Sequence, residues 1–587
     1  FSTDGFQTWY YGYVMIFLGE YKLATGDESV MPGLRRLALE AANGQSIVGS
    51  WGHGFAGPDG RLRGYGMMNS PGIPLTIGLI MAQRAGVNDP IVRTAIQRSA
   101  RLIRFYVGKG AVPYGDHHPW IQTHEDNGKC GMAAVMFNML GDKEAAQFFS
   151  RMSVASHGAE RDCGHTGNFF NILWAIPGVA LSGPNATGLW MKEFGSWYFD
   201  LARRWDGTFA HLGPPEMQND KYAGWDCKGV YMLAYAIPLK KTCLTGKWPS
   251  IVDQLDSQTA KSLIEDGRGW TNKDRNGFYD ALSEEELLRR LESWSPVVRE
   301  RAAMALARRQ KSPSVTLIEM LRSPRLEARY GACQALAQFN RSAAPAVPML
   351  MELLTHKDLW LRIKAAEALA AIGSPAKPAL PLLLQRMAIG STAQDPRGME
   401  QRYLCFVLAD SWRQMLGRSL EGLDRESFYA AIRAGLQNED GRARSVVASI
   451  YEDLSFEEIK PLLPDIHRAI LEPAPSGIMF ADGSRLAGLR VLAKYHVAEG
   501  IEACVKYAET QNPWGSQKRI VDLMKVLESY GVHSRPMIPR LEQLAERFEK
   551  GEEGFPFQLS QEKAKIVRDA IRAIEVSQER PPLIHLR

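Results

Sequence analysis

Polar and aromatic residues gather in four short, glycine-containing segments of the first half of the sequence. They read GSWGHGF (49–55), YGDHHPWIQTHEDNGKCG (114–131), ERDCGHTG (160–167) and YAGWDCKG (222–229). Each precedes a run of apolar residues typical of a buried helix. Acidic, histidine and aromatic side chains that converge on a cavity are the usual material of an active site. We therefore interpret the four segments as loops around the mouth of one cavity.

Two carbohydrate chemistries fit these side chains. Glycoside hydrolysis needs a carboxylic acid and a carboxylate on either side of the scissile bond. β-Elimination on a uronate polysaccharide needs a histidine or tyrosine base and a group that neutralises the carboxylate. The catalytic candidates are Asp116, His117, His118, Glu125, Asp126, Asp162, His165 and Asp226. The candidates for binding the sugar rings are Trp51, His53, Tyr114, Trp120 and Trp225.

A zinc site is a third interpretation of the same segments. Cys163, His165 and Cys227 are residue types that ligate zinc, as in toroidal prenyltransferases and lanthionine cyclases. The sequence contains no C-x-x-C or H-E-x-x-H motif, however, and isolated cysteines usually pack as small apolar residues. Asp162 has a structural alternative too, because an aspartate at a helix start accepts backbone N–H bonds. We predict no metal and no cofactor, and keep zinc as the less supported alternative.

The elements that must position these loops are helices of two kinds. One kind is apolar on all sides, as a buried helix is, and the other has a polar face, as an outer helix has. Their alternation predicts an α/α toroid, and QSIVGSW (45–51) fits the Q-x-x-x-G-x-W signature that pins helix ends in such folds. About five pairs can be traced where six are usual, so we expect an incomplete six-hairpin barrel. The apolar helices are predicted at 9–21, 72–83, 130–140, 167–180 and 229–239, and amphipathic ones at 31–42, 95–108 and 190–205.

The second half of the sequence has a different, repeating pattern. The tripeptide Ala-Leu-Ala recurs at 305–307, 335–337 and 368–370, each time after a turn that contains Pro or Asp. A repeat of roughly 30 residues, with small residues on one helix face, predicts a solenoid of helical hairpins. These repeats resemble short HEAT-like repeats, most clearly over 283–390. The predicted fold is therefore all-α, with a toroid domain at 1–250, a linker at 251–282 and a HEAT/ARM-like repeat domain at 283–580.

The composition of the sequence limits the classes of molecule that the protein is expected to bind. A formal net charge of +5 over 587 residues, with no basic run, argues against a nucleic-acid partner. No stretch of 18 apolar residues occurs, so no membrane span is predicted. Seven scattered cysteines do not form a disulfide framework. The partners that we expect are a polysaccharide substrate and a protein bound by the HEAT-like domain.

Taken together, the quoted segments resemble an uncharacterised bacterial family. That family joins a PDZ-like module, an α/α toroid of the terpene-cyclase and prenyltransferase kind, and HEAT-like repeats. FQTWYYGY (6–13) and DGRGWTNKDRNG (266–277) contribute to the resemblance, which covers essentially the whole chain. It implies that a PDZ-like segment and the first toroid helices precede residue 1, and that the protein is exported to the periplasm or beyond. It supplies no catalytic residues, and the sequence itself does not indicate a localisation.

Two functions of different classes follow from these patterns. The first is a carbohydrate-active enzyme, a glycoside hydrolase or polysaccharide lyase with its site at the loop rim. The second is a protein-binding scaffold without enzymatic activity, in which the HEAT-like array presents the binding surface. The sequence leaves open whether the chain is an enzyme.

Overall fold

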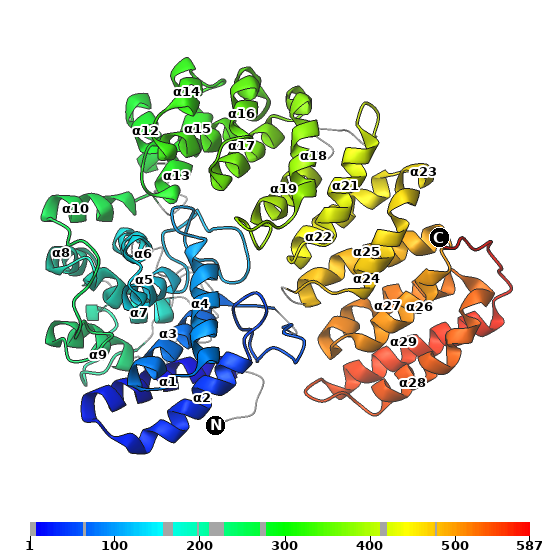
Figure 1. Cartoon of the computed structure of the whole chain (residues 1–587), viewed down its shortest axis with the longest axis horizontal. Coiled ribbons are helices and arrows are strands. Elements are labelled where there is room, and N and C mark those ends of the chain that lie inside the picture. The colour runs from blue at the N-terminus through cyan, green and yellow to red at the C-terminus, as the bar shows by residue number, and fades with distance from the viewer. Residues whose placement is uncertain are drawn as a thin grey trace. The chain divides into compact units, whose positions relative to one another are not determined.

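In the computed structural model, all regular secondary structure of the described residues is helical (Figure 1). These are residues 7–62, 66–156, 168–195, 199–210, 228–269, 277–410, 420–475 and 478–586. Isolated β-bridges occur in the described part, without a strand of any length. The chain divides into two compact units. Unit 1 comprises residues 1–62 and 67–343, and unit 2 comprises residues 63–66 and 344–587.

Unit 1 begins with an inner layer of apolar helices that pack in chain order. Nearly every residue of α3 is buried, as expected of a helix without a polar face. Each inner helix packs against the next one in the series, and aromatic side chains of α7 also contact α1. The inner helices are α1 (Gln7–Thr25), α3 (Asn69–Ala85), α5 (Lys129–Leu140), α7 (Asn168–Ala180) and α9 (Lys228–Ala236).

The helices between them form an outer layer. They are amphipathic: α4, for example, buries Val92, Ile96 and Ile103 and exposes its charged side chains. Capping sets where several of them begin, as at α4, where Asp89 accepts a hydrogen bond from the N–H of Ile91. The outer helices are α2 (Met31–Asn43), α4 (Pro90–Arg104), α6 (Lys143–Ala155), α8 (Pro184–Gly195) and α10 (Ser257–Asp266). The predicted alternation holds for α3 and α5, which are largely buried, whereas α1 and α9, also predicted to be buried on all sides, expose Phe17 and Tyr235 to solvent.

Glycines allow the inner helices to approach closely. A Cβ atom on Gly12 of α1 would lie 2.7 Å from the backbone nitrogen of Leu75 in α3. A Cβ atom on Gly131 of α5 would lie 2.3 Å from the carbonyl oxygen of Trp174 in α7. Both distances are below van der Waals contact with rigid backbone, so a larger residue would push the helices apart.

The QSIVGSW motif joins three helices, as its signature predicts. The side-chain amide of Gln45 donates to the carbonyl oxygen of Ala95 in α4 at 2.8 Å. The indole N–H of Trp51 donates to the carbonyl oxygen of Ala41 in α2 at 2.7 Å, and the Trp51 ring is fully buried against the inner helix α3. The motif therefore fixes the end of α2 and the middle of α4 to the inner layer.

Unit 1 also contains the first HEAT-like helices, and α13 is tied to the preceding loops. Two fully buried arginines of this helix reach back in the sequence. Arg299 Nη2 donates to the carbonyl oxygen of Gly108, and Arg301 Nη2 donates to that of Gln122. Burial lowers the pKa of Arg299 to about 10. The helices are α12 (Glu284–Leu291), α13 (Pro296–Arg309), α14 (Val315–Glu319) and α15 (Leu326–Phe339).

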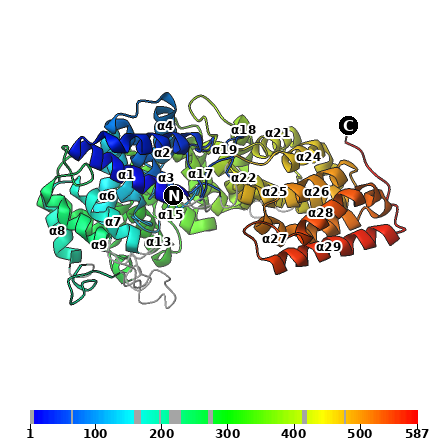
Figure 2. The same ribbon diagram turned by 90° about the horizontal axis from the view of Figure 1, so that it is seen from below.

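Unit 2 continues the helical hairpins to the C-terminal end, where α28 and α29 lie side by side (Figure 2). The second helix of each hairpin packs against the second helix of the next hairpin, from α17 to α29. This stacking is the arrangement of a solenoid. The hairpin helices are α16 (Val347–Leu353), α17 (Leu359–Ile372), α18 (Leu380–Ile389), α19 (Met399–Asp410), α21 (Arg425–Gly435), α22 (Gly441–Ala448), α23 (Phe456–Ile459), α24 (Leu463–Leu471), α25 (Ile478–Lys494), α26 (Glu499–Thr510), α27 (Pro513–Glu528), α28 (Ile538–Glu549) and α29 (Phe557–Val576).

An arginine recurs at the same place in several helical hairpins of both units. A guanidinium N–H donates to the carbonyl oxygen six residues earlier, in the turn before the helix, and so ties that turn to its own helix. The repeat thus has a polar signature in addition to its Ala-Leu-Ala core. The pairs are Arg299–Ser293, Arg329–Ser323, Arg362–His356 and Arg444–Asn438, at 2.7, 2.5, 2.7 and 2.6 Å.

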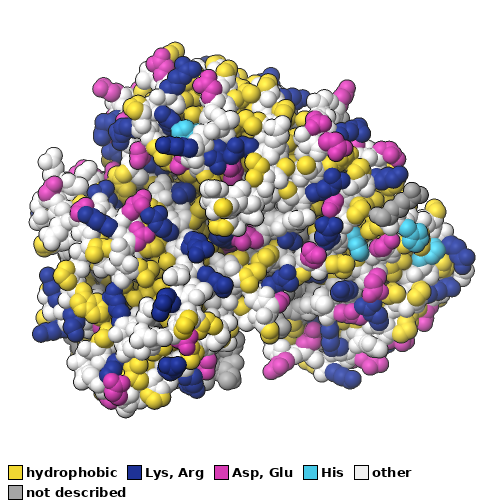
Figure 3. Space-filling model, in the orientation of Figure 1, with side chains coloured by type: hydrophobic (Ala, Val, Ile, Leu, Met, Phe, Trp, Pro, Cys, Tyr) yellow, Lys and Arg dark blue, Asp and Glu magenta, His cyan; other side chains and the backbone are white. Residues whose placement is uncertain are grey.

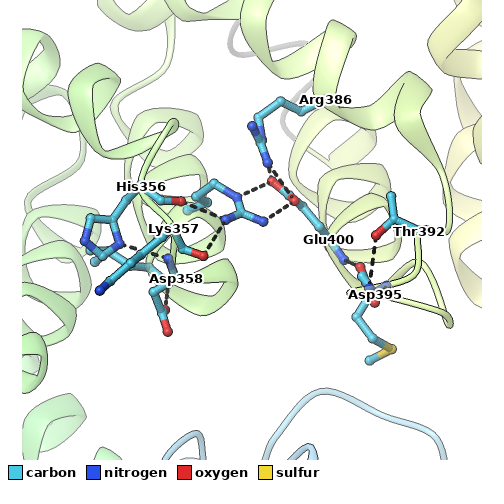
Figure 4. A network of polar contacts seen from close by, with 10 residues as sticks. His356, Lys357, Asp358, Arg386, Thr392, Asp395 and Glu400 are labelled. Carbon is cyan, nitrogen blue, oxygen red and sulfur yellow. Dashed lines mark hydrogen bonds and ion pairs between the residues drawn. The ribbon is translucent and has the colours of Figure 1, made fainter.

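Glu400 of α19 links three helices of unit 2 (Figure 4). Its carboxylate accepts paired hydrogen bonds from Arg362 of α17, at 2.8 and 2.5 Å, and from Arg386 of α18, at 2.5 and 2.8 Å. Burial alone would raise the pKa of Glu400, but the bonds from the two arginines outweigh it and the pKa is lowered. The carboxylate therefore stays ionised and holds adjacent hairpins together.

Candidate functional site

The inner helices α1, α3, α5 and α7 begin at the same end of the domain. Thr8, in the first turn of α1, donates to the carbonyl oxygens of Gly52 and His53 at 2.7 and 2.6 Å. A bridge joins Trp51 to Met68, directly before α3, and a second bridge joins Met68 to Gly115. The loops predicted at the cavity mouth are therefore brought together for the first two segments.

The first turn of α7 closes the same end. Gly128, before α5, donates its N–H to Oδ1 of Asn171 at 2.5 Å, and its Cα lies against the carbonyl group of Phe170. The Phe170 ring lies 6.1 Å from the Trp9 ring of α1, centroid to centroid. We refer to this end, formed by residues 8–9, 51–53, 67–69, 111–128 and 170–171, as the loop rim.

Aromatic side chains occupy the rim between α1 and α7. The indole N–H of Trp9 donates to Nδ1 of His53 at 3.0 Å, which fixes the orientation of both rings. Further along the helices, Trp174 Nε1 donates to the hydroxyl oxygen of Tyr13 at 3.2 Å, and burial raises the pKa of Tyr13. Trp9 and Tyr13 were not among the predicted site residues, although FQTWYYGY contains both.

Residues 111–120 form a short turn-back that presents the central candidates. Ala111 and Trp120 exchange backbone hydrogen bonds at 2.7 and 3.0 Å, which places Tyr114, Asp116, His117 and His118 in the intervening bend. Tyr114, His117 and His118 are half-buried, whereas Asp116 is 3% exposed. A Cβ atom on Gly115 would lie 3.0 Å from Nε2 of His117, so the imidazole lies over this glycine.

Asn69 of α3 supports this bend. Its side-chain amide donates to the carbonyl oxygens of Pro113 and Gly115 at 2.8 and 3.2 Å, and its backbone N–H donates to that of Tyr114. Trp120, predicted to bind a sugar ring, donates its indole N–H to Thr123 Oγ1 at 2.7 Å. Trp51 was also predicted to bind a sugar ring. It is fully buried within the contacts of the QSIVGSW motif, so its ring has no exposed face to offer a ligand.

Glu125 has a structural role at the start of α5. Its side chain is fully buried, and Oε1 accepts hydrogen bonds from the N–H groups of Asp126 and Cys130, both at 2.9 Å. Oε2 accepts from the N–H of Gly131 at 3.1 Å. The N–H groups of Cys130 and Gly131 belong to the first turn of the helix, which has no preceding carbonyls to satisfy them. Glu125 therefore caps α5.

Asp126 is also committed to a partner inside the protein. Its Oδ2 lies 2.9 Å from Nζ of Lys129, whose side chain is fully buried. The Lys129 ammonium in turn lies 5.7 Å from the centroid of the Tyr114 ring. An ionised lysine needs such a partner when it is removed from water. The Asp126–Lys129 ion pair therefore packs against the bend that contains Tyr114.

His124 connects the rim to the first HEAT-like helices. Its Nε2 lies 2.8 Å from Oγ of Ser295, the residue that caps α13, and its ring lies 6.5 Å from that of Trp294. Trp294 donates its indole N–H to Asp266 Oδ2 at 3.2 Å. Burial raises the pKa of Asp266, an effect that the charge of His124 opposes. His124 lies in one of the predicted loops, but nothing in that segment indicates a partner 171 residues away.

The third and fourth predicted segments lie outside the described residues. They contain Asp162, Cys163, His165, Trp225, Asp226 and Cys227, so their assignments remain predictions. Among the described residues, no group of three or more His, Cys, Asp or Glu side chains is placed to hold a metal ion. Cys130, in the second segment, is buried, and burial together with the charge of Glu125 raises the pKa of its thiol.

An open groove that the sequence did not indicate lies beside the rim. It has a volume of about 1010 Å³ and is formed by the first turns of α1, the outer side of α2 and residues 55–58. Its lining includes Tyr11, Arg35, Arg36, Glu40, Asn43 and Phe55.

Charged side chains of both signs are interspersed on the face of the molecule drawn in Figure 3. This pattern agrees with the absence of a basic run from the sequence.

Of the helices in the described residues, none combines the length and the apolar character that crossing a membrane requires.

Comparison with known proteins identifies two regions. Residues 1–246 match a family described as a domain of unknown function (DUF6288). Residues 314–395 match HEAT repeats. The chain therefore combines a region that matches this domain family with HEAT-like repeats in an all-α fold. The recurrent arginine extends the repeat pattern from Arg299 to Arg444, beyond both ends of the HEAT match.

No curated protein has detectable sequence similarity to the chain. One similar solved structure is the crystal structure of Kap121p bound to Pho4p, with 11% sequence identity and a TM-score of 0.29. The match covers 96% of this chain and 61% of that chain, so this chain spans less than two thirds of its length. At this level the likeness has no bearing on function.

Proposed function

We propose that the N-terminal domain is an α/α toroid whose loop rim cleaves an acidic polysaccharide by β-elimination. The observation that carries the proposal is the meeting of histidine- and aromatic-rich loops where four inner helices begin. The contact of α7 with α1, through Trp174 and Tyr13, supports a closed inner layer. The carboxylate of Glu125 already occupies the start of α5, so the attraction for a polyanionic substrate comes from the positive ends of the other helix dipoles at this rim.

Elimination fits the described residues better than hydrolysis does. Hydrolysis needs two carboxyl groups free to face the sugar. Glu125 is occupied by three backbone N–H groups and Asp126 by Lys129, and Asp116 is only 3% exposed. The half-buried side chains of the bend are instead Tyr114, His117 and His118, which are residue types that act as general bases and acids.

The proposed reaction is a proton transfer followed by bond cleavage. One of the three side chains takes the proton from C5 of the uronate, next to its carboxylate. The electron pair left on C5 forms a double bond to C4, and the bond from C4 to the glycosidic oxygen breaks. A second side chain returns a proton to that oxygen, which leaves as a new reducing end. The carboxylate is the group that the helix N-termini would stabilise.

The test uses the full chain with polygalacturonate, alginate and a glucuronate-containing polymer. The expected result is ultraviolet absorbance from the new C4–C5 double bond, reduced at least about a hundredfold in His117→Ala. His585→Ala is the matched control, because this exposed histidine lies in unit 2, and its activity should equal that of the wild type. New reducing ends without absorbance would mean hydrolysis, and neither product from any polymer would refute an enzyme of this class.

A protein-binding scaffold is the second candidate function. It is favoured by one observation: both described acids of the segment HEDNGKCG are used inside the protein, as helix caps and ion pairs are. The HEAT-like repeats would then present the binding surface, as repeat solenoids commonly do. Under this function the His117→Ala variant would keep its binding partner, since the rim would have no part in the interaction.

A further inference from the structure

The groove beside the rim has a rigid aromatic wall. The rings of Tyr11 and Phe55 meet edge to face, with centroids 5.2 Å apart. Phe55 lies directly on Gly44, where a Cβ atom would be 2.4 Å from Cγ of the phenylalanine. Ala56 donates its N–H to the carbonyl oxygen of Gly44 at 2.9 Å, which fixes the loop in this position. The absence of a side chain at residue 44 is thus what allows the aromatic wall to form.

The polar part of the groove is organised as well. The hydroxyl of Tyr11 donates to Glu40 Oε2 at 2.6 Å. Burial raises the pKa of Tyr11 to about 12, and the hydrogen bond to Glu40 adds to this effect. The hydroxyl therefore stays protonated and turned towards Glu40, and the ring stays in one orientation.

Arginines give the groove its charge. Arg35 and Arg36 both line it and are both exposed, and the nearest carboxylate to Arg35 is that of Asp89, at 3.8 Å. Asp89 thus offsets the charge of Arg35, and the carboxylate of Glu40 is engaged by Tyr11. The groove therefore presents the guanidinium group of Arg36 next to an aromatic surface, a combination that suits an anionic ligand with an apolar ring face.

The loop that lines the groove also belongs to the rim. His53 bonds to Trp9 in the rim, and Phe55, two residues later, lines the groove. Tyr11 likewise follows Trp9 by two residues on α1. Residues two apart on a helix point to different sides of it, so the rim and the groove are neighbouring but separate surfaces.

We propose that the groove is a second, non-catalytic binding site for acidic oligosaccharides. The guanidinium group of Arg36 would pair with a uronate carboxylate, while the rings of Phe55 and Tyr11 contact the sugar. The choice of ligand class rests on the proposed function, but binding in the groove does not require that cleavage occurs.

The experiment measures binding of defined galacturonate, mannuronate and glucuronate-containing oligosaccharides to the full chain by titration calorimetry. A methyl-esterified oligogalacturonate is the uncharged comparison. We expect binding of at least one acidic oligosaccharide, little or none of the ester, and an affinity about tenfold lower in Arg36→Ala. Arg93→Ala removes the same charge from an exposed position of α4 outside the groove and should bind as the wild type does.

Phe55→Ala tests the aromatic wall, and a melting curve of each variant shows whether the fold is retained. Arg36→Ala keeps the test decisive if Phe55→Ala fails to fold, because Arg36 is an exposed side chain. The proposed binding site is refuted by any of three results. These are that no acidic oligosaccharide binds, that the ester binds equally well, or that Arg36→Ala binds like Arg93→Ala and the wild type.

The failure of the proposed function would look different. If Arg36-dependent binding of oligosaccharides is found but no polymer yields an unsaturated product, the proposed elimination is refuted and the proposed binding site in the groove is supported. If product forms but Arg36→Ala neither weakens oligosaccharide binding nor raises KM for long polymers, the proposed binding site is refuted and the proposed elimination is supported.

Discussion

Glu125 in unit 1 and Glu400 in unit 2 are both removed from water, but they are held in opposite ways. Glu125 is surrounded by neutral donors, the backbone N–H groups at the start of α5. Glu400 is surrounded by cations, the guanidinium groups of Arg362 and Arg386. The first carboxylate stabilises one helix end, and the second joins three helices of successive hairpins.

This difference follows from the two architectures. In unit 1, buried helices must begin inside the protein, so their first N–H groups need an acceptor that the loop itself supplies. In unit 2, each hairpin contacts only its neighbours, so specificity depends on side chains that reach from one hairpin to the next. Acidic residues near a suspected active site therefore require a check for such structural partners before a catalytic role is assigned.

The largest effect is expected for Glu125→Ala. The substitution leaves three buried N–H groups without their acceptor and should cost about 3 kcal/mol of stability. Hydrogen exchange at the start of α5 would report the loss locally, and the melting temperature would report it globally. Glu285→Gln, at an exposed position in the first turn of α12, is the control. Unchanged exchange at residues 126–131 would contradict the capping role.

Glu400→Gln should have a smaller effect, about 2 kcal/mol, because two partly buried guanidinium groups lose their counter-charge. The effect should depend on pH. The pKa of Glu400 is lowered from its ordinary value of 4.5, so its stabilisation is complete above that value and is lost as the pH falls through the folded-state pKa. The difference between the wild type and the variant should therefore shrink in acid.

Hydrogen exchange of α17 to α19, measured from neutral pH downwards, checks this prediction. A difference between the two proteins that stays constant down to acid pH would contradict it, since the glutamine cannot titrate. Thermal melts alone are less informative here, because a chain with two units need not unfold in one step.

Much of the fold follows from the sequence because apolar patterning determines which helices are buried. The all-apolar helices at 72–83 and 130–140 lie within α3 and α5, and QSIVGSW makes the predicted pin. The gathering of the first two polar segments at one end also follows, since each precedes an inner helix. The toroid itself and the roles of the rim residues remain proposals.

The direction and partner of each side chain did not follow from the sequence. The string HEDNGKCG lists acids and a histidine without showing that Glu125 turns towards its own helix or that His124 meets Ser295. The groove was missed for a related reason. Tyr11, Glu40 and Phe55 are unremarkable in their own segments and become a surface only when α1, α2 and the loop pack together.

The smallest effect is expected for an ion pair exposed to solvent, which completes the comparison. Glu286 of α12 accepts hydrogen bonds from Arg289 and Arg290 at 2.6 to 2.9 Å, much as Glu400 does from its two arginines. The Arg289 side chain is 69% exposed and Glu286 is 28% exposed, so water screens this pair, although Arg290, at 14% exposed, is about as buried as Arg362. Glu286→Gln should therefore cost about 0.5 kcal/mol, and molar salt should abolish the difference, because it screens exposed charges. The cost of Glu400→Gln should survive the same salt concentration. Hydrogen exchange of α12 and of α17 to α19, measured for both variants at low and high salt, tests this locally: equal salt sensitivity would show that burial does not distinguish the two networks.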